Sequence, residues 1–315
     1  MKRHFPAILA IALAISSSGT VDAANRVERF FGTGSPWNQR LPSRPRLANT
    51  SRSIIAFTWS QGDGVMRMPR IDGADYGFPL YYGHANDPLV RIHCREPWGR
   101  CAIEGRLVRI PAEARAAAES DAHLTIVNNN TSFELYETPP GPYRARTLSV
   151  GYGTVVDNLA RDSGWPGPGV TAAGASALGG RVPVAELRTA HIRHALALAT
   201  ACSTASSVPP ATASASQTCN GEPAPNAAPL GSRFWLDSTP RQIARLRLSR
   251  MSTVVLDALH EYGAFMTDTN GESATVDLRN IPGSPTSKRD LRTLPPQFWL
   301  RHLHVVAPCV TTRRC

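Results

Sequence analysis

The sequence has little that could hold it in a membrane. The apolar run FPAILAIALAI, at 5–15, is well short of the about 20 residues that a transmembrane helix needs. It follows the basic residues Lys2 and Arg3 and precedes 21–24, an A-x-A-like cleavage site with valine in the first small position. This layout predicts a secretory signal peptide over 1–23, no transmembrane segment, and a mature protein that is secreted or periplasmic.

Lysine is also scarce. It occurs only as Lys2 and Lys288, so arginine carries almost all the positive charge of a chain with a net charge of +10. The basic residues are dispersed, whereas nucleic-acid-binding proteins gather them on one stripe or face. We therefore expect no nucleic-acid partner. A dispersed basic surface suits a polysaccharide or another polyanionic envelope component, and it equally serves solubility alone.

Several chemical signatures are missing. No C-x-x-C and no H-E-x-x-H stretch occurs, and these are the common zinc motifs. The small-residue segment 164–180 has no G-x-S-x-G nucleophile elbow. It also lacks the lysine that follows the glycines in a phosphate-binding loop. His302 and His304 share one side of a predicted strand, but they lack a defined third ligand. We predict neither a metal nor a cofactor.

The six cysteines fall into three pairs that are close in sequence. An exported protein is expected to oxidise them to disulfides, although six cysteines allow fifteen connectivities. Pairing of neighbours predicts the bridges Cys94–Cys101, Cys202–Cys219 and Cys309–Cys315.

Short apolar alternations bounded by Gly, Pro, Asn and Asp recur through the first half of the chain. Such spacing is typical of a sandwich or barrel rather than of alternating strands and helices. We predict a single mainly β domain over 24–315, an antiparallel β-sandwich of jelly-roll type with two or three helices. The expected strands are 54–59, 78–82, 89–92, 107–110, 123–128, 132–138 and 153–158.

Helical patterns appear in the second half. The spacing of apolar residues predicts a helix over 182–200. A second is expected over 252–263, with Ser252 as its cap, and a third over 240–246, capped by Thr239. The intervening stretch, at about 203–229, is rich in Ala, Ser, Thr and Pro and poor in large apolar residues. We predict that it is a flexible, disordered insertion tied at its base by a disulfide.

One hairpin gathers acid–base groups. Asp121 and His123 are two residues apart and so face one side of the predicted strand, and Glu134 and Tyr136 do the same on the next strand. A turn centred on Asn129 would bring Glu134 within reach of His123. Neighbouring carboxylates separate each other's pKa values, so this cluster is a candidate acid–base site. A solvated polar face of the hairpin is the alternative.

His194 is a second candidate, because it lies among apolar residues on the inward face of the predicted helix 182–200. Burial of an imidazole requires a polar partner. Asp121, Glu134, Asp268 and Tyr262 are the expected partners, and Tyr262 is itself a candidate catalytic group. A core histidine bonded to a backbone carbonyl is the alternative.

Two tryptophans are candidates for sugar binding. Trp98 and Trp165 lie beside glycine and proline in predicted loops, and exposed tryptophans in such loops stack on sugar rings. Burial in the core is the alternative for both.

Several segments together resemble a group of uncharacterised exported bacterial proteins. They are SPWN at 35–38, DxHL at 121–124, FELY at 133–136, HAL at 194–196 and ALxxYG at 258–263. The chain is also similar, in architecture only, to jelly-roll glucanases and polysaccharide lyases, although their catalytic strand motifs are missing. Likeness in architecture does not by itself imply a function.

The sequence thus predicts an exported carbohydrate-active enzyme that cleaves a polysaccharide by hydrolysis or by β-elimination. Hydrolysis needs an acid and a base or nucleophile, for which Asp121 and Glu134 are suited. Elimination needs a base and a group that neutralises a uronate, for which His123 or His194, Tyr262 and an arginine are suited. A non-catalytic glycan-binding protein and a structural envelope protein are the alternatives.

Overall fold

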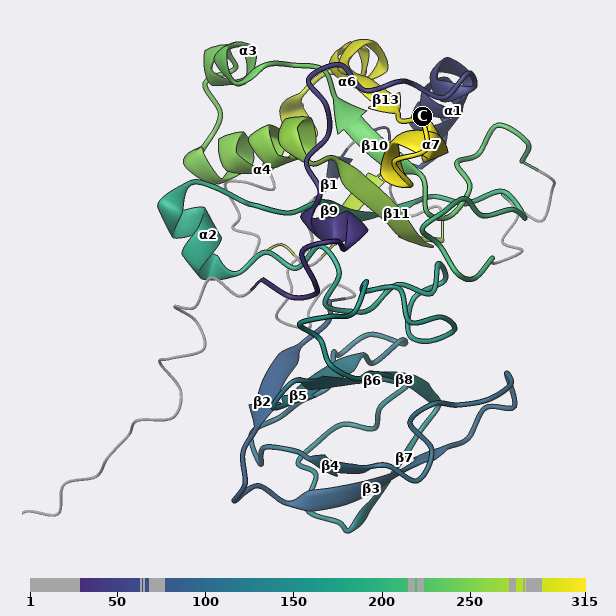
Figure 1. Cartoon of the computed structure of the whole chain (residues 1–315), viewed down its shortest axis with the longest axis vertical. Coiled ribbons are helices and arrows are strands. Elements are labelled where there is room, and N and C mark those ends of the chain that lie inside the picture. The colour runs from purple at the N-terminus through teal and green to yellow at the C-terminus, as the bar shows by residue number, and fades with distance from the viewer. Residues whose placement is uncertain are drawn as a thin grey trace, which may run out of the picture.

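The computed structural model describes residues 29–62, 64, 66–67, 77–214, 219, 224–271, 276–279, 281 and 291–315. The predicted signal peptide lies outside these residues. Figure 1 shows two stacked parts, a helix-covered sheet above and a pair of smaller sheets below.

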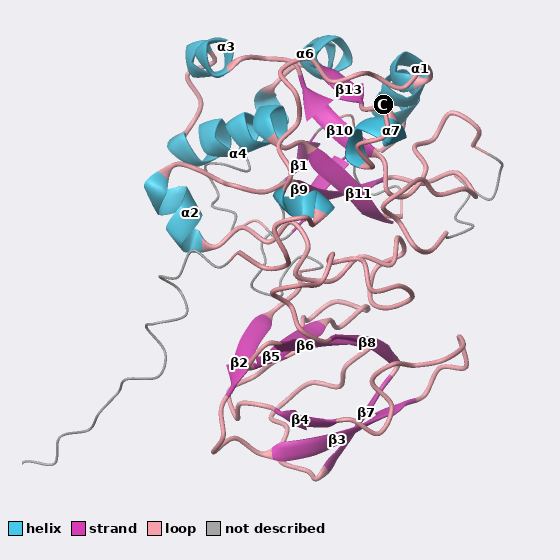
Figure 2. Cartoon of the chain, in the orientation of Figure 1, coloured by secondary structure: helices cyan, strands magenta, loops and turns pink. Residues whose placement is uncertain are grey.

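The upper part is built on a six-stranded mixed sheet with the order β1-β12-β9-β11-β10-β13. Helices surround this sheet, as the colouring by secondary structure in Figure 2 makes plain. Its strands are β1 (Met66–Arg67), β9 (Leu196–Thr200), β10 (Arg233–Leu236), β11 (Ala264–Thr269), β12 (Val276–Arg279) and β13 (Leu303–Val305). The helices of this part are α1 (Ser51–Ser60), α2 (Val184–Thr189), α3 (Pro240–Arg245), α4 (Arg250–Glu261), α6 (Pro296–His302) and α7 (Pro308–Thr311), with a 3-10 turn, η2, at Pro36–Asn38.

The lower part consists of two facing sheets with an apolar core of their own. One has the order β2-β5-β6-β8 and the other the order β4-β3-β7. Ile92, Val108, Ile126 and Leu135 are buried in this second core. The strands are β2 (Leu80–Gly83), β3 (Leu89–Cys94), β4 (Leu107–Arg109), β5 (Leu124–Asn128), β6 (Thr131–Tyr136), β7 (Thr147–Val150) and β8 (Tyr152–Val156).

The mainly β class is confirmed at this coarse level, but the sheets are mixed rather than antiparallel. The pairs β1–β12, β2–β5, β3–β7 and β9–β11 are parallel. Parallel partners need long crossover connections, and here β3 and β4 lie in the chain between β2 and β5. Alternation along one strand does not report the direction of its neighbour, so this arrangement was not predictable from the pattern.

Two predicted elements are wrong. The expected strand 54–59 is part of the helix α1, where Ile54, Ile55 and Trp59 are buried together. The expected helix 182–200 ends at Ala190, whose left-handed backbone (φ 57°) closes α2, and the chain continues as β9. Leu196–Thr200 is buried along its whole length, and such a continuous apolar run fits a central strand as well as a helix.

The other two helices are confirmed. Thr239 caps α3 through a capping box with Gln242. The helix predicted over 252–263 begins two residues earlier than expected, with Ser249 as its cap, and Gly263 follows its end with a φ of +71°.

The predicted insertion at about 203–229 is only partly within the described residues. Those that are described bond to the body of the protein: the Val208 amide donates to the Leu230 carbonyl and the Thr212 amide to the Ala173 carbonyl. This part of the segment is docked, in contrast to the predicted flexibility.

All three predicted disulfides are confirmed, namely Cys94–Cys101, Cys202–Cys219 and Cys309–Cys315. Within the described ranges, no helix combines the length and apolar character needed to cross a bilayer.

Candidate functional site

A cleft of about 400 Å³ has lining residues from both parts of the fold. The lower part supplies Asp121, His123 and Tyr136, and the upper sheet supplies Asp268, Asp277 and Arg279. Acidic, basic and aromatic side chains from distant segments therefore converge in one concave site, which is the usual setting of a binding or catalytic centre.

Asp121 and His123 form the first pair of the cleft, as the sequence suggested. Oδ2 of Asp121 lies 3.7 Å from Nε2 of His123. The His123 ring is buried and packs against Phe78 at a tilt, with 4.2 Å between ring centroids. The His123 imidazole, and less strongly the charge of Arg279, hold the pKa of Asp121 below its usual range. Asp121 is therefore more readily ionised than an ordinary aspartate.

Tyr136 lies beside this pair, with its ring centroid 5.4 Å from that of His123. Burial, and then the charge of Asp121, raise the pKa of Tyr136 to about 12. The phenol therefore keeps its proton at neutral pH and can act as a hydrogen-bond donor in the cleft.

Glu134 does not belong to the cleft, contrary to prediction. The hairpin pairs Thr125 with Glu134, so Glu134 shares a face with His123 as expected, but it lies further into the hairpin and against the segment that carries Ser176. Glu134 is fully buried, and its carboxylate accepts hydrogen bonds from Ser132, Ser176 and the Ala177 amide.

Burial raises the pKa of Glu134 to about 7, although these three donors oppose the shift. Through Ser176 and the Ala177 amide, this carboxylate links β6 to the small-residue segment 164–180. Its role in this position is structural.

Asp268 enters the cleft because of a β-bulge in β11. Ala264 pairs with Leu196 and Met266 with Leu198, but the register then shifts, so that Asp268 pairs with Ala199. In a regular strand Asp268 would face the same side as Met266, because the two are two residues apart. The bulge at Thr267 instead pairs Asp268 with Ala199 and turns its side chain to the opposite side. Bulges commonly redirect a side chain beside an active site.

The same register places a second carboxylate in line with Asp268. Asp277 on β12 also pairs with Ala199, on the other side of β9. Residues in register on neighbouring strands share a face, so both carboxylates flank one small alanine, with their backbones two strand spacings or about 10 Å apart. Asn270 donates to Asp277 Oδ2 at 3.3 Å.

The charge state of Asp268 differs from that of Asp121. Burial raises the pKa of Asp268, against the opposing charge of Arg279 and the Thr269 amide. Two carboxyl groups with opposite pKa shifts in one cleft are suited to the separate roles of acid and base. Asp268, Asp277 and Arg279 were missed as sites by the sequence analysis, because the bulge that orients Asp268 leaves no pattern in the sequence.

Trp98 lies at the rim of the cleft and is 56% exposed. Its ring centroid is 5.7 Å from that of Tyr136 and 5.8 Å from that of Tyr152. The prediction placed an exposed tryptophan here, and its free face is available for stacking.

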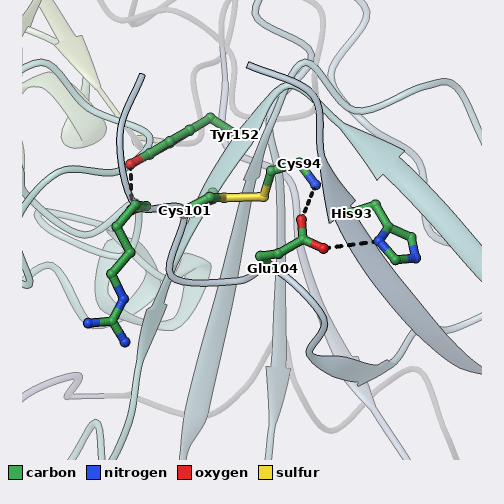
Figure 3. Close-up of a disulfide and its surroundings, with 7 residues drawn as sticks. His93, Cys94, Cys101, Glu104 and Tyr152 are labelled. Atoms are coloured by element: carbon green, nitrogen blue, oxygen red, sulfur yellow. Dashed lines mark hydrogen bonds and ion pairs between the residues drawn. A yellow bond between two sulfur atoms is a disulfide. The ribbon is translucent and has the colours of Figure 1, made fainter. Parts of the chain in front are cut away.

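The loop that carries Trp98 is closed at its base by Cys94–Cys101, which Figure 3 shows with its surroundings. The Tyr152 hydroxyl donates to the Arg100 carbonyl at 2.7 Å. Glu104 accepts from the Cys94 amide at 2.6 Å and lies 3.0 Å from His93 Nδ1. These contacts fix both ends of the short loop and so position Trp98.

The remaining predicted residues lie elsewhere. His194 is buried, with Nε2 3.0 Å from Glu186 and Nδ1 2.8 Å from the Ala195 carbonyl. None of the four expected partners contacts it within the described residues, because the chain turns back after α2 and brings Glu186 to the imidazole. His194 therefore joins α2 to the start of β9.

Tyr262 and Trp165 are also core residues of the upper part. The Tyr262 hydroxyl accepts from Arg40 Nε at 3.1 Å. Trp165 stacks on Trp37 with 5.3 Å between centroids and packs edge-on against Phe265. Neither lines the cleft: the burial alternative holds for Trp165, and the structure does not place Tyr262 among the cleft groups.

His302 and His304 share one acceptor, Asp237, at 2.6 Å and 3.2 Å. Among the described residues, no group of three or more His, Cys, Asp or Glu side chains is arranged to hold a metal ion.

Comparison of the chain with protein-family models, with curated proteins and with solved structures gives no match. The resemblance to exported bacterial proteins stays a prediction.

Proposed function

We propose that this protein is a carbohydrate-active enzyme that hydrolyses glycosidic bonds in the cleft between its two parts. The observation that carries the proposal is the meeting of Asp121, from the lower part, and Asp268, from the upper sheet, in one cleft with the exposed Trp98 at its rim. Two carboxyl groups and an aromatic platform are what a glycosidase needs to cleave and to hold a sugar chain.

The charge states assign the roles. Asp268, whose pKa is raised by burial, is the better suited of the two to carry a proton and to donate it to the glycosidic oxygen as the bond to the anomeric carbon breaks. Asp121, with its lowered pKa, is ionised and accepts a proton from the water that attacks this carbon. The His123 imidazole, with Nε2 3.7 Å from Oδ2 of Asp121, orients this carboxylate.

A second candidate is β-elimination, and Arg279 and Tyr136 favour it. Arg279 can neutralise a uronate and Tyr136 can donate a proton to the leaving oxygen. His123 is poorly placed as the base, because Nε2 faces Asp121 and Nδ1 is buried without a hydrogen-bond partner among the described residues. Hydrolysis is therefore the better-supported reaction.

The test is a panel of neutral and uronic polysaccharides, with reducing ends measured alongside absorbance at the wavelength of unsaturated uronates. Hydrolysis releases reducing ends without the absorbance, and elimination gives both. If the protein binds glycans but releases no reducing ends, it is a binding module. If it neither binds nor cleaves any member of the panel, the proposal is wrong and a structural envelope role is favoured.

A further inference from the structure

Arg279 is the one arginine among the described residues that line the cleft. It is only 4% exposed, and its Nε has no hydrogen-bond partner among the described residues. Nη2 lies 3.9 Å from Asp268 Oδ2, beyond the about 2.7–2.9 Å of a charge-assisted hydrogen bond. The guanidinium is therefore a buried cation whose contact with Asp268 is loose.

The guanidinium is held in place from one side. Cζ of Arg279 lies 5.5 Å from the centroid of Phe78, and the Phe78 ring also packs against His123. Arg279 is the last residue of β12, a strand that is paired with both β1 and β9. A guanidinium stacked on a ring and carried by an internal strand presents its donors in a fixed plane, which matches a carboxylate better than a flexible ammonium would.

We propose that Arg279 binds the carboxylate of a uronic acid residue, so that the substrate is an acidic polysaccharide. This inference rests on the proposed function of the cleft and specifies its substrate class. A buried, preorganised guanidinium in a sugar-binding cleft is suited to the planar carboxylate of a uronic acid residue, while Trp98 stacks on a neighbouring ring.

The carboxylates of the cleft do not prevent this binding. Asp121 is next to His123, and Asp277 accepts from Asn270. Asp268 lies 3.9 Å from Nη2, which is too far for a charge-assisted hydrogen bond that would occupy the guanidinium, and burial raises the pKa of this carboxyl. At longer range the net charge of +10 attracts a polyanion.

The test compares binding of two matched ligand sets by calorimetry: oligouronides, and the same oligosaccharides after chemical reduction of their carboxyl groups to alcohols. The set covers galacturonate, glucuronate, mannuronate and guluronate oligomers. D268N is used as the background so that turnover does not interfere. R279Q and R279K are compared on this background with R106Q, which changes an exposed arginine of the lower part.

We expect at least one acidic oligomer to bind tenfold or more tightly than its reduced form. R279Q should abolish this preference, R279K should retain part of it, and R106Q should leave it unchanged. Equal affinity for both forms, no binding of any oligouronide, or a preference that survives in R279Q would overturn the assignment. If R279Q does not fold, an unaltered preference in R279K is the contradicting result.

This experiment separates the two proposals. Binding of oligouronides through Arg279 without any cleavage by the wild type would reject the enzymatic function and keep the subsite. Cleavage of neutral and acidic polymers at equal rates would keep the enzyme and reject the subsite.

Discussion

Asp268 and Arg279 lie 3.9 Å apart in the cleft although they come from β11 and β12, two strands that β9 separates. Their side chains meet above Ala197–Ala199, where the central strand carries only small residues on this face. The small residues of β9 leave room for polar groups from both neighbours, and the bulge in β11 turns Asp268 into that space.

The opposite pKa shifts of the two acids predict a bell-shaped dependence of kcat/KM on pH. Activity rises with pH as Asp121 ionises, below the usual aspartate range near about 3.9, and falls as Asp268 loses its proton above that range. Initial rates from pH 3 to pH 9 on one cleaved substrate measure both limbs. A profile with no alkaline limb would remove Asp268 as the acid.

Glu134 predicts a pH dependence of stability that is separate from activity. Its pKa of about 7 in the folded protein exceeds the ordinary 4.5. Between these values the folded state binds more protons than the unfolded state, so the free energy of unfolding falls as pH rises, by on the order of 3 kcal/mol in all.

E134Q should remove most of this fall, because the amide stays neutral at every pH. The measurement is urea unfolding at pH 5 and pH 8. Relative to the wild type, the free energy of unfolding of E134Q should be higher at pH 8 than at pH 5. If both proteins lose the same stability between the two pH values, Glu134 is not the titrating group.

The position of Glu134 was predictable from the sequence only in part. The hairpin, its two strands and the shared face of His123 and Glu134 follow from alternation and from the asparagine turn. Whether that face is open or covered depends on the segment that carries Ser176, which is remote in sequence. Covering by a distant loop leaves no trace in the strand itself.

His194 carries the same lesson. Its burial and its need for a partner were predictable from the apolar surroundings. The partner was not, because Ala190 adopts a left-handed conformation that ends α2 and lets Glu186 reach back. Local periodicity cannot report such a turn at a residue that favours helix.

H194Q should lower the free energy of unfolding by about 1–3 kcal/mol and leave kcat unchanged, because it breaks a buried polar pair whose residues do not line the cleft. Thermal melts and initial rates on the same preparation give both quantities. Lost activity with an unaltered melt would return His194 to the list of catalytic candidates.

The Cys94–Cys101 bridge predicts a link between oxidation and glycan binding. Replacing both cysteines with serine frees the base of the Trp98 loop, and affinity for the glycan should fall several-fold because the loop must then be ordered on binding. Stability should fall by about 2–3 kcal/mol. The matched control replaces Cys309 and Cys315, whose bridge lies at the other end of the protein, and should leave affinity unchanged. Equal losses in both variants would show that the bridge acts only through global stability.

The most direct test of the central claim is the rate of reducing-end release by D268N, D121N and E134Q at the pH optimum. A hydrolase built on Asp121 and Asp268 loses on the order of 10²–10⁴-fold in kcat in the first two variants. E134Q, an equally conservative change at a buried carboxylate outside the cleft, keeps the wild-type rate. Wild-type rates in D268N and D121N, with loss in E134Q, would contradict the account.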